Sequence, residues 1–151
     1  MYRRILVPVG HDEASHAGVR EAVRLARQSG AQLRFVHAAD ARVDGLRHPG
    51  FLGTPEDALA LMRCEGLVQL DLATCVAASS GVRSSALFVP PVGSRPCEAI
   101  LDEARRWEAD VIVAARPTAG GNDDGVPCLA DEILATTSLT SMAITPGRAD
   151  G

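Results

Sequence analysis

Short apolar runs of strand length alternate with amphipathic segments of helix length along the whole chain, and this alternation is the feature that most limits its fold. The apolar runs are rich in β-branched residues, which is typical of strands that helices cover on both faces. Parallel strands require helical crossovers, and these crossovers are almost always right-handed. The alternation therefore predicts an α/β fold with a doubly wound parallel sheet.

Five strands and four helices are predicted, in strict alternation. The strands are expected at residues 3–9, 32–38, within 85–93 before Pro90 and Pro91, and at 109–115 and 141–145. The helices are expected at residues 13–29, from 54 to Gly81, 94–107 and 127–137. The stretches 39–53 and 116–126 are expected to be irregular loops.

The helix boundaries have clear local signals. Gly30 stands where a helix usually ends on a residue with positive φ. Thr54, Pro55 and Asp57 have the spacing of a capped helix start. Two sheet-facing stripes follow from the helical period, one of Leu59, Met62, Gly66, Leu70, Ala73 and Ala77, the other of Cys97, Ile100, Leu101 and Ala104.

The chain has 151 residues, which fits one domain spanning residues 1–151, and no linker or repeat divides it. A net charge of −4 argues against a nucleic-acid partner, since no basic field would attract phosphates. No apolar run approaches the ~20 residues that span a bilayer, so no membrane association is expected. The N-terminus lacks the apolar region of a signal peptide, and a cytoplasmic location is expected.

The four cysteines, Cys64, Cys75, Cys97 and Cys128, are far apart and form no C-x-x-C pair. This spacing favours reduced packing residues over a disulfide framework or a metal site. Cys64 and Cys75 fall inside a predicted helix, where small thiols are commonly buried.

Several blocks of sequence resemble the universal stress protein (UspA-like) family in the correct order. These blocks are "RRILVPV" followed by "EASHAGVREAVRLARQSGAQLRFVHAAD", then "PCEAILDEARRWEADVIVAA", and finally "DEILATTSLTSMAIT". The resemblance covers essentially the whole chain. It implies a five-stranded, Rossmann-like sheet in the order 3-2-1-4-5, similar to the adenine nucleotide alpha hydrolase-like folds, and ligands at the carboxyl ends of strands 1 and 4.

The family's ATP-binding pattern is degenerate in this chain. The resemblance places Gly10 where the nucleotide-binding branch has Asp, and His11 and Asp12 where it has Gly and Ser. Two further family glycines fall on Ala115 and Thr118. The last Gly-Ser pair falls on Pro127 and Cys128, or on Cys128 and Leu129. A Cβ in place of glycine obstructs close approach of a phosphate, and proline has no N–H to donate.

The loop "RPTAGGNDDGV" carries Asp123 and Asp124 just before the last helix. Two carboxylates there can satisfy the helix N-terminus as a phosphate would, and they would repel a triphosphate. A Mg²⁺ site on these two aspartates is the alternative, although hard cations usually need more oxygens.

The remaining polar side chains near the crevice allow either a structural or a functional reading. His11, Asp12 and Glu13 suit the first turn of a helix better than a metal or acid–base site. His37, at the end of the second strand, is expected to be a satisfied, half-buried side chain, and Trp107 an anchoring core residue. No nucleophile elbow, P-loop or H-E-x-x-H motif occurs, so no catalytic residues are predicted and the chain is not expected to be an enzyme.

The leading hypothesis is a universal stress protein-like regulatory or interaction module that has lost ATP binding and serves in stress response. It would need no cofactor or metal, act on an unidentified protein partner, and form a homodimer through its last strand "SMAIT". The alternative is a nucleotide-binding member, for ATP or AMP, with an altered pocket. The vestigial crevice would be formed by Pro8, Gly10, His11, His37, Ala115, Thr118 and Cys128. A third hypothesis is a binder of another small ligand, walled by His37 and the loop 39–53.

Overall fold

The computed structural model describes residues 2–40, 53–91, 95–116, 128–137 and 140–144. Strands and helices alternate along the described chain, which confirms the predicted α/β fold with a parallel sheet. The strands are β1 (Arg4–Pro8), β2 (Gln32–Ala38), β3 (Ser84–Val89), β4 (Val111–Ala115) and β5 (Thr140–Ile144). The helices are α1 (Glu13–Ser29), α3 (Pro55–Ser79), α4 (Pro96–Arg106) and α5 (Leu129–Thr136).

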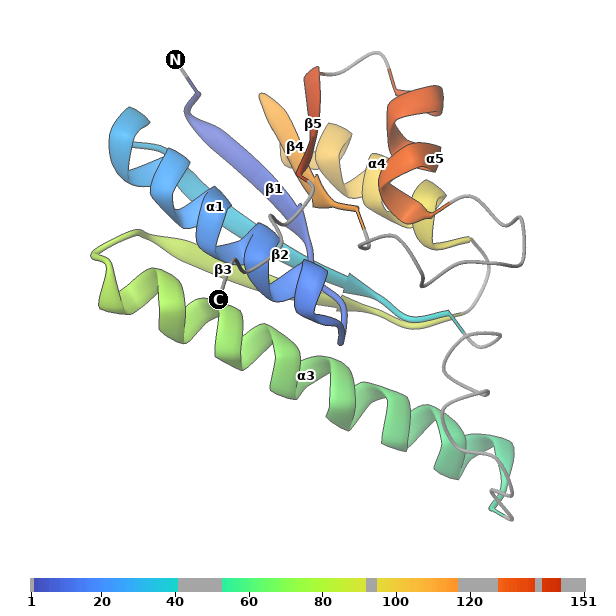
Figure 1. The fold of residues 1–151 in the computed structure, drawn as a ribbon. Coiled ribbons are helices and arrows are strands. Elements are labelled where there is room, and N and C mark those ends of the chain that lie inside the picture. Colours follow the sequence, from blue (N-terminus) through green and yellow to red (C-terminus); the bar gives the residue numbers. More distant parts are fainter. Residues whose placement is uncertain (1, 41–52, 92–94, 117–127, 138–139, 145–151) are drawn as a thin grey trace, which may run out of the picture.

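The strands of the described chain lie in the order β3-β2-β1-β4-β5, with β1 in the centre (Figure 1). Every paired strand is parallel to its neighbour, and β1 is in register with β2 from Arg4–Gln32 to Pro8–Val36. The strands after β1 are added on one side of it up to β3, and β4 and β5 are added on its other side. The switch point of the strand order therefore lies between β1 and β4. In this topology the carboxyl ends of β1 and β4 are the expected place for a ligand.

Each face of the sheet carries its own core. One face is covered by α1 and α3, and its core includes Ile5, Phe35 and Leu70, none more than 1% exposed. The other face is covered by α4 and α5, where Leu6, Ile100 and Ile133 are fully buried. Alternate residues of β1 and β2 belong to the cores on opposite faces of the sheet, because successive side chains of a strand point to opposite faces.

The predicted helix boundaries are accurate where caps define them. Asp12 caps α1, and Gly30 ends it with φ +70°. The start of α3 is a complete capping box, in which Thr54 and Asp57 each accept a hydrogen bond from the other's backbone N–H. Where such signals are weaker, the observed strands and helices are one or two residues shorter at an end than predicted, as in β4 and α4.

The sheet-facing stripe predicted for α3 is wrong at its beginning. Gly66, Leu70, Ala73 and Ala77 are buried, but Met62 is half-buried and Leu59 is 39% exposed. The helix has 25 residues, whereas β2 and β3 have seven and six. Its first turns therefore extend beyond the sheet edge (Figure 1).

Two cysteines also depart from expectation. All four are free, but Cys64 and Cys75 on α3 are exposed rather than buried. Both lie on the side of the helix opposite Gly66 and Leu70, so membership of a helix did not imply burial. Cys97, on the sheet-facing stripe of α4, is buried as predicted, and Cys128 is half-buried.

Trp107 combines a packing role with a surface role. It is half-buried against the core shared by α4 and α5. The guanidinium carbons of Arg34 and Arg4 lie 4.8 and 5.9 Å from its ring centroid. Arg34 also forms a 2.6 Å ion pair with Glu103, a carboxylate that is 95% buried. The expected anchoring residue is thus also a stacking surface for two arginines.

None of the described helices is long and apolar enough to cross a membrane.

Candidate functional site

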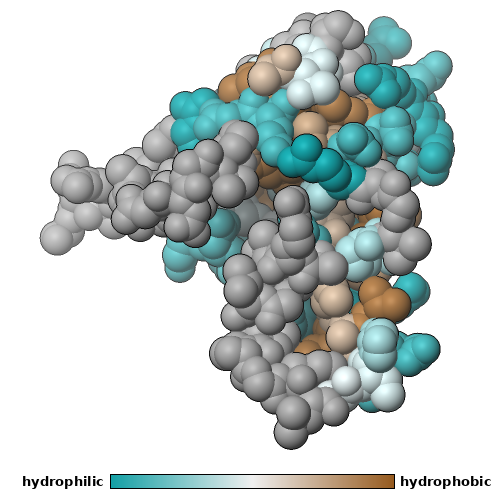
Figure 2. Space-filling model, turned by 90° about the vertical axis from the view of Figure 1, so that its right-hand side faces the viewer, coloured by the Kyte–Doolittle hydropathy of each residue, from teal (hydrophilic) through white to brown (hydrophobic). Residues whose placement is uncertain are grey.

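The candidate site lies at the carboxyl ends of the strands, where β1 and β2 end beside the N-terminus of α1. Figure 2 views the molecule from this side; hydrophilic residues predominate in its upper part and hydrophobic ones appear in its lower part. The predicted residues that the structure describes fall into two groups, one after β1 and β2 and one after β4. Thr118 and Pro127, as well as Asp123 and Asp124, lie outside the described residues.

In the first group, the turn after β1 is held together by its own hydrogen bonds. The Gly10 N–H donates to Ser15 Oγ at 2.7 Å. The Ser15 N–H donates in turn to Asp12 Oδ1 at 2.8 Å. Asp12 is therefore the N-cap of α1, one position before the first turn in which the sequence placed it. Pro8, the last residue of β1, has no N–H of its own to offer a ligand.

The backbone conformation at residue 10 does not require glycine. A Cβ added there would meet Ser15 Cβ and Oγ at 3.9 Å, which is ordinary contact, and its φ lies outside the left-handed region. The Cβ of another residue would therefore fit at this position.

His37 bridges the ends of β1 and β2. The side chain is only 4% exposed, and its Nδ1 donates to the Val9 carbonyl oxygen at 2.7 Å. Because a carbonyl can only accept, Nδ1 carries the proton and Nε2 is an unprotonated acceptor in the neutral ring. Within the described chain Nε2 has no hydrogen-bond partner. The expectation of a half-buried, satisfied histidine is thus wrong on burial and only half right on hydrogen bonding.

Aromatic rings surround His37. The His11 ring approaches it edge-on with a centroid distance of 5.0 Å, so the structure brings these two predicted residues together. Phe88 of β3 stacks on the His37 ring with a centroid distance of 5.9 Å. Gly66 of α3 closes the cluster, because a Cβ there would lie 2.6 Å from His37 Cδ2 and 2.8 Å from the Phe88 ring. The imidazole is held in a tightly packed aromatic cluster.

In the second group, Arg116 and Cys128 both bind Asp131 of α5. The Arg116 guanidinium donates to Asp131 Oδ1 at 2.6 and 3.1 Å. The Cys128 thiol donates to Asp131 Oδ2 at 3.1 Å. The hydrogen bonds from Cys128 and Arg116 lower the pKa of Asp131, and that from Cys128 contributes most. Burial, followed by the bond to Asp131, raises the pKa of the Cys128 thiol, so it stays protonated at neutral pH.

Ala115 ends β4 against α1 rather than opening toward a ligand. A Cβ added to Gly18 of α1 would lie 2.9 Å from Ala115 Cβ. The methyl group of Ala115 thus fills the space that the missing side chain of Gly18 leaves. Within the described residues, no group of three or more His, Cys, Asp or Glu side chains could hold a metal ion.

Sequence reasoning missed Ser15, the contact of Gly66 with His37 and the pairing of Arg116 with Asp131. Ser15 has a local signal, since it lies three residues after the capping Asp12. The approach of Gly66 to His37 has none, because the two residues are 29 positions apart and meet only through the packing of α3 on the sheet.

Comparison with known proteins agrees with this fold. The chain is similar to a universal stress protein family structure from Burkholderia pseudomallei (23% identity, 95% of this chain and 96% of that chain, TM-score 0.73). It is also similar to the universal stress protein from Archaeoglobus fulgidus in complex with dAMP (19%, 94% and 97%, 0.66) and to UspA from Lactobacillus plantarum (20%, 95% and 97%, 0.64). At these identities the likeness shows the fold.

No curated protein matches the chain. The family model described as "Universal stress protein family" matches residues 1–123, which is most of the chain. The predicted resemblance is confirmed, and the chain belongs to the universal stress protein family.

Proposed function

We propose that this chain is a regulatory or interaction module of the universal stress protein type, serving in stress response without holding ATP in its crevice. The observation that carries the proposal is that the polar groups at the carboxyl edge are bound to one another. We also propose that it has no catalytic activity of its own and needs no cofactor or metal.

The turn after β1 supports this reading. Backbone N–H groups at the start of a helix are the usual donors to a bound phosphate. Here the Gly10 N–H is bound by Ser15 Oγ, and the Ser15 N–H by the Asp12 carboxylate. A phosphate would have to displace a serine hydroxyl and would meet the negative charge of the cap.

The charges at α5 point the same way. Asp131 and Glu132 occupy the first turn of α5, where they interact favourably with the positive end of the helix dipole. Both carboxylates are already paired with arginines, Asp131 with Arg116 at 2.6 Å and Glu132 with Arg95 at 3.0 Å. A triphosphate placed here would have to compete with these carboxylates for the two guanidinium groups.

A second candidate is a nucleotide-binding protein with an altered pocket. The similar Archaeoglobus fulgidus protein is in complex with dAMP, and the topology around β1 and β4 is preserved in this chain. The buried acceptor Nε2 of His37, which has no hydrogen-bond partner among the described residues, is the side-chain observation in favour of a polar ligand of this or another small-molecule class.

Nucleotide binding distinguishes the two candidates. Protein purified without added nucleotide is analysed for bound adenine nucleotides, and its thermal unfolding is followed with and without Mg-ATP, ATP, AMP and dAMP. A ligand at one hundred times its Kd stabilises by about 2.7 kcal/mol, which shifts Tm by roughly 5–10 °C in a chain of this size. We expect no nucleotide and a shift below 1 °C. Copurified ATP, or a saturable shift of several degrees, would contradict the proposal.

We further propose that the chain forms a homodimer through β5. Among the described strands, β5 is at one edge of the sheet and is paired on one side with β4. Such edges are usually covered or paired with another chain. A location in the cytoplasm is also proposed, in keeping with four free cysteines.

The dimer is tested by light scattering after gel filtration, on the wild type and on Met142→Pro and Ala143→Pro. Successive N–H groups of a strand point to opposite neighbours, so one of these prolines removes a bond to β4 and the other an N–H at the outer edge. The variant that stays folded is expected to be a monomer. A monomeric wild type, or a folded variant that is still dimeric, would argue against this interface.

A further inference from the structure

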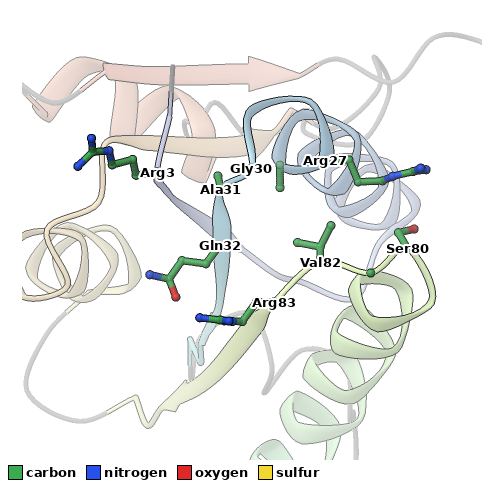
Figure 3. A pocket seen from close by; sticks show the side chains of 10 residues that line it. Arg3, Arg27, Gly30, Ala31, Gln32, Ser80, Val82 and Arg83 are labelled. Carbon is green, nitrogen blue, oxygen red and sulfur yellow. The ribbon is translucent and has the colours of Figure 1, made fainter.

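A cavity lies at the end of the sheet opposite the candidate site, where β1, β2 and β3 begin (Figure 3). It has a volume of about 570 Å³ and lies beside the C-terminal ends of α1 and α3. All strands of the sheet are parallel, so their amino ends lie together at one edge, here called the amino edge. The length of the strands separates this edge from the candidate site at their carboxyl ends. Neither the resemblance nor the site described above gives this cavity a role.

The lining of the cavity is strongly basic. Three arginines line it, Arg3, Arg27 and Arg83, and no acidic side chain is among the described residues that do. All three are exposed, and within the described chain none of them forms an ion pair, whereas Arg24 and Arg34 pair with glutamates. Three unpaired cations at one place are unexpected in a chain with a net charge of −4.

The helix ends account for only part of this charge. Arg27 is in the last turn of α1, where a cation interacts favourably with the helix dipole. Arg3 and Arg83 precede strands and have no such role. Asp110, which lies near Arg3, uses its Oδ2 to accept hydrogen bonds from the backbone N–H groups of Arg3 and Arg4 at 2.7 and 2.8 Å.

The backbone of β2 holds Arg3 and Arg83 on its two sides. The Gln32 N–H donates to the Arg3 carbonyl at 3.0 Å, and the Leu33 N–H donates to the Arg83 carbonyl at 2.9 Å. Neighbouring strands are about 4.8 Å apart, so the two arginine backbones are separated by roughly 10 Å. Figure 3 shows the side chains of Arg3, Gln32 and Arg83 pointing in one direction and that of Arg27 pointing in the opposite direction, so the arginines flank the pocket on two sides and do not converge on one point.

This spacing suits an elongated anion better than a single small one. Guanidinium groups bind phosphate oxygens through two parallel hydrogen bonds, and the Gln32 amide and Ser80 hydroxyl add neutral donors. Among the described lining residues there is no aromatic ring on which a base could stack. We propose that this cavity binds a small polyanion carrying two or more phosphate groups, recognised through its phosphates alone.

The test uses inorganic tripolyphosphate as the probe and isothermal titration calorimetry as the readout. The full chain is compared with the double variant Arg3→Gln/Arg83→Gln and with Arg27→Gln. The matched control is Arg105→Gln/Arg20→Gln, which removes the same charge as the double variant from exposed positions on α4 and α1 outside the cavity. All five substituted arginines are exposed, and circular dichroism checks that each variant is folded.

We expect saturable binding at 50 mM salt that weakens at 300 mM salt, because screening reduces exposed charge interactions. The double variant should weaken binding at least tenfold and Arg27→Gln at least threefold, while the control stays within twofold. No measurable binding to the wild type would overturn the proposal, as would an equal loss in the control, which would indicate nonspecific attraction. Binding unaffected by the cavity variants would also overturn it and would place the probe elsewhere, for example in the carboxyl-edge crevice.

Discussion

At the scale of single residues, side chains at the carboxyl edge bind groups of their own chain. Hydrogen bonds of 2.6–2.8 Å are accepted there by Ser15, Asp12 and Asp131. Each of them occupies a donor that could otherwise bind a ligand. An incoming anion would have to displace these hydrogen bonds, two of which are made to carboxylates, and would also meet the negative charge of those carboxylates. This self-pairing is the physical basis for proposing a crevice without ATP.

The cysteines give a direct residue-scale prediction. Brief treatment of the native protein with N-ethylmaleimide should modify Cys64 and Cys75, which are exposed, and spare Cys97. Cys97 is buried, and this burial raises the pKa of its thiol, so little reactive thiolate forms. Peptide mass spectrometry locates the adducts, and the same treatment in urea, where all four should react, is the control. Rapid modification of Cys97 in the native protein would contradict its placement in the core.

Asp110 predicts a dependence of stability on pH. Its hydrogen bonds from the backbone N–H groups of Arg3 and then Arg4 hold its pKa below the ordinary value. The stabilisation is therefore present above the unfolded pKa of about 3.9 and is lost as pH falls through the lower folded pKa. Asp110→Asn should lower the free energy of unfolding by about 1 kcal/mol at pH 7, since solvent screens part of these exposed bonds.

Urea unfolding at pH 7, 5 and 3 measures the effect of Asp110→Asn. The difference from the wild type should be constant between pH 7 and 5 and shrink by pH 3. Asp102→Asn is the matched control, because the partner of Asp102 among the described residues is Arg105, in an exposed ion pair whose loss should change stability little. A difference that grows toward low pH would refute this account.

At the scale of elements, close contacts through glycine decide how helices sit on the sheet. Gly18 brings α1 against Ala115 of β4, and Gly66 brings α3 against His37 of β2. In both places an added Cβ would come closer than 3.0 Å to a neighbouring atom. The helices can approach the strands this closely only because these positions have no side chain.

The contact between Gly18 and Ala115 can be tested by exchanging the two residues. Gly18→Ala should lower the free energy of unfolding by about 1–2 kcal/mol, because overpacking outweighs the gain in helix propensity. Adding Ala115→Gly should recover most of this loss, since it removes the Cβ at 2.9 Å. Urea unfolding of the wild type, both single variants and the double variant completes the cycle. Additive single effects would show that the two residues do not interact.

At the scale of the whole molecule, two cores share one sheet. Ile5 and Leu6 are neighbours in β1, yet they belong to opposite cores. Loss of β1 would therefore expose both cores at once. This arrangement favours one cooperative unit, which is also what the lack of a linker in the sequence predicts.

Cooperative unfolding is measurable with the chain's single tryptophan. Trp107 fluorescence reports on the face covered by α4 and α5, whereas far-ultraviolet circular dichroism reports on all helices. We expect urea midpoints from the two probes to coincide, as in two-state unfolding. Independent transitions would show that the two faces unfold separately. Each probe is calibrated on refolded protein, so that irreversibility is not mistaken for an intermediate.

Much of this fold could be predicted from local signals. The capping residues Asp12 and Thr54 and the terminator Gly30 specify their helix ends through hydrogen bonds a few residues long. The apolar runs predict the strands in the same local way. The basic cavity at the amino edge was not predicted, because Arg3, Arg27 and Arg83 are 24 and 56 residues apart along the chain.

The sequence by itself determined the order of strands and helices and the helix ends marked by Thr54 and Gly30, because each depends on neighbours along the chain. Only the tertiary structure decided that Cys64 and Cys75 are exposed, that Gly66 closes on His37, and that Asp131 takes both Arg116 and Cys128. These outcomes depend on which face of each helix meets the sheet and how far the helix extends past it. Packing between distant segments sets both, and the local pattern does not encode it.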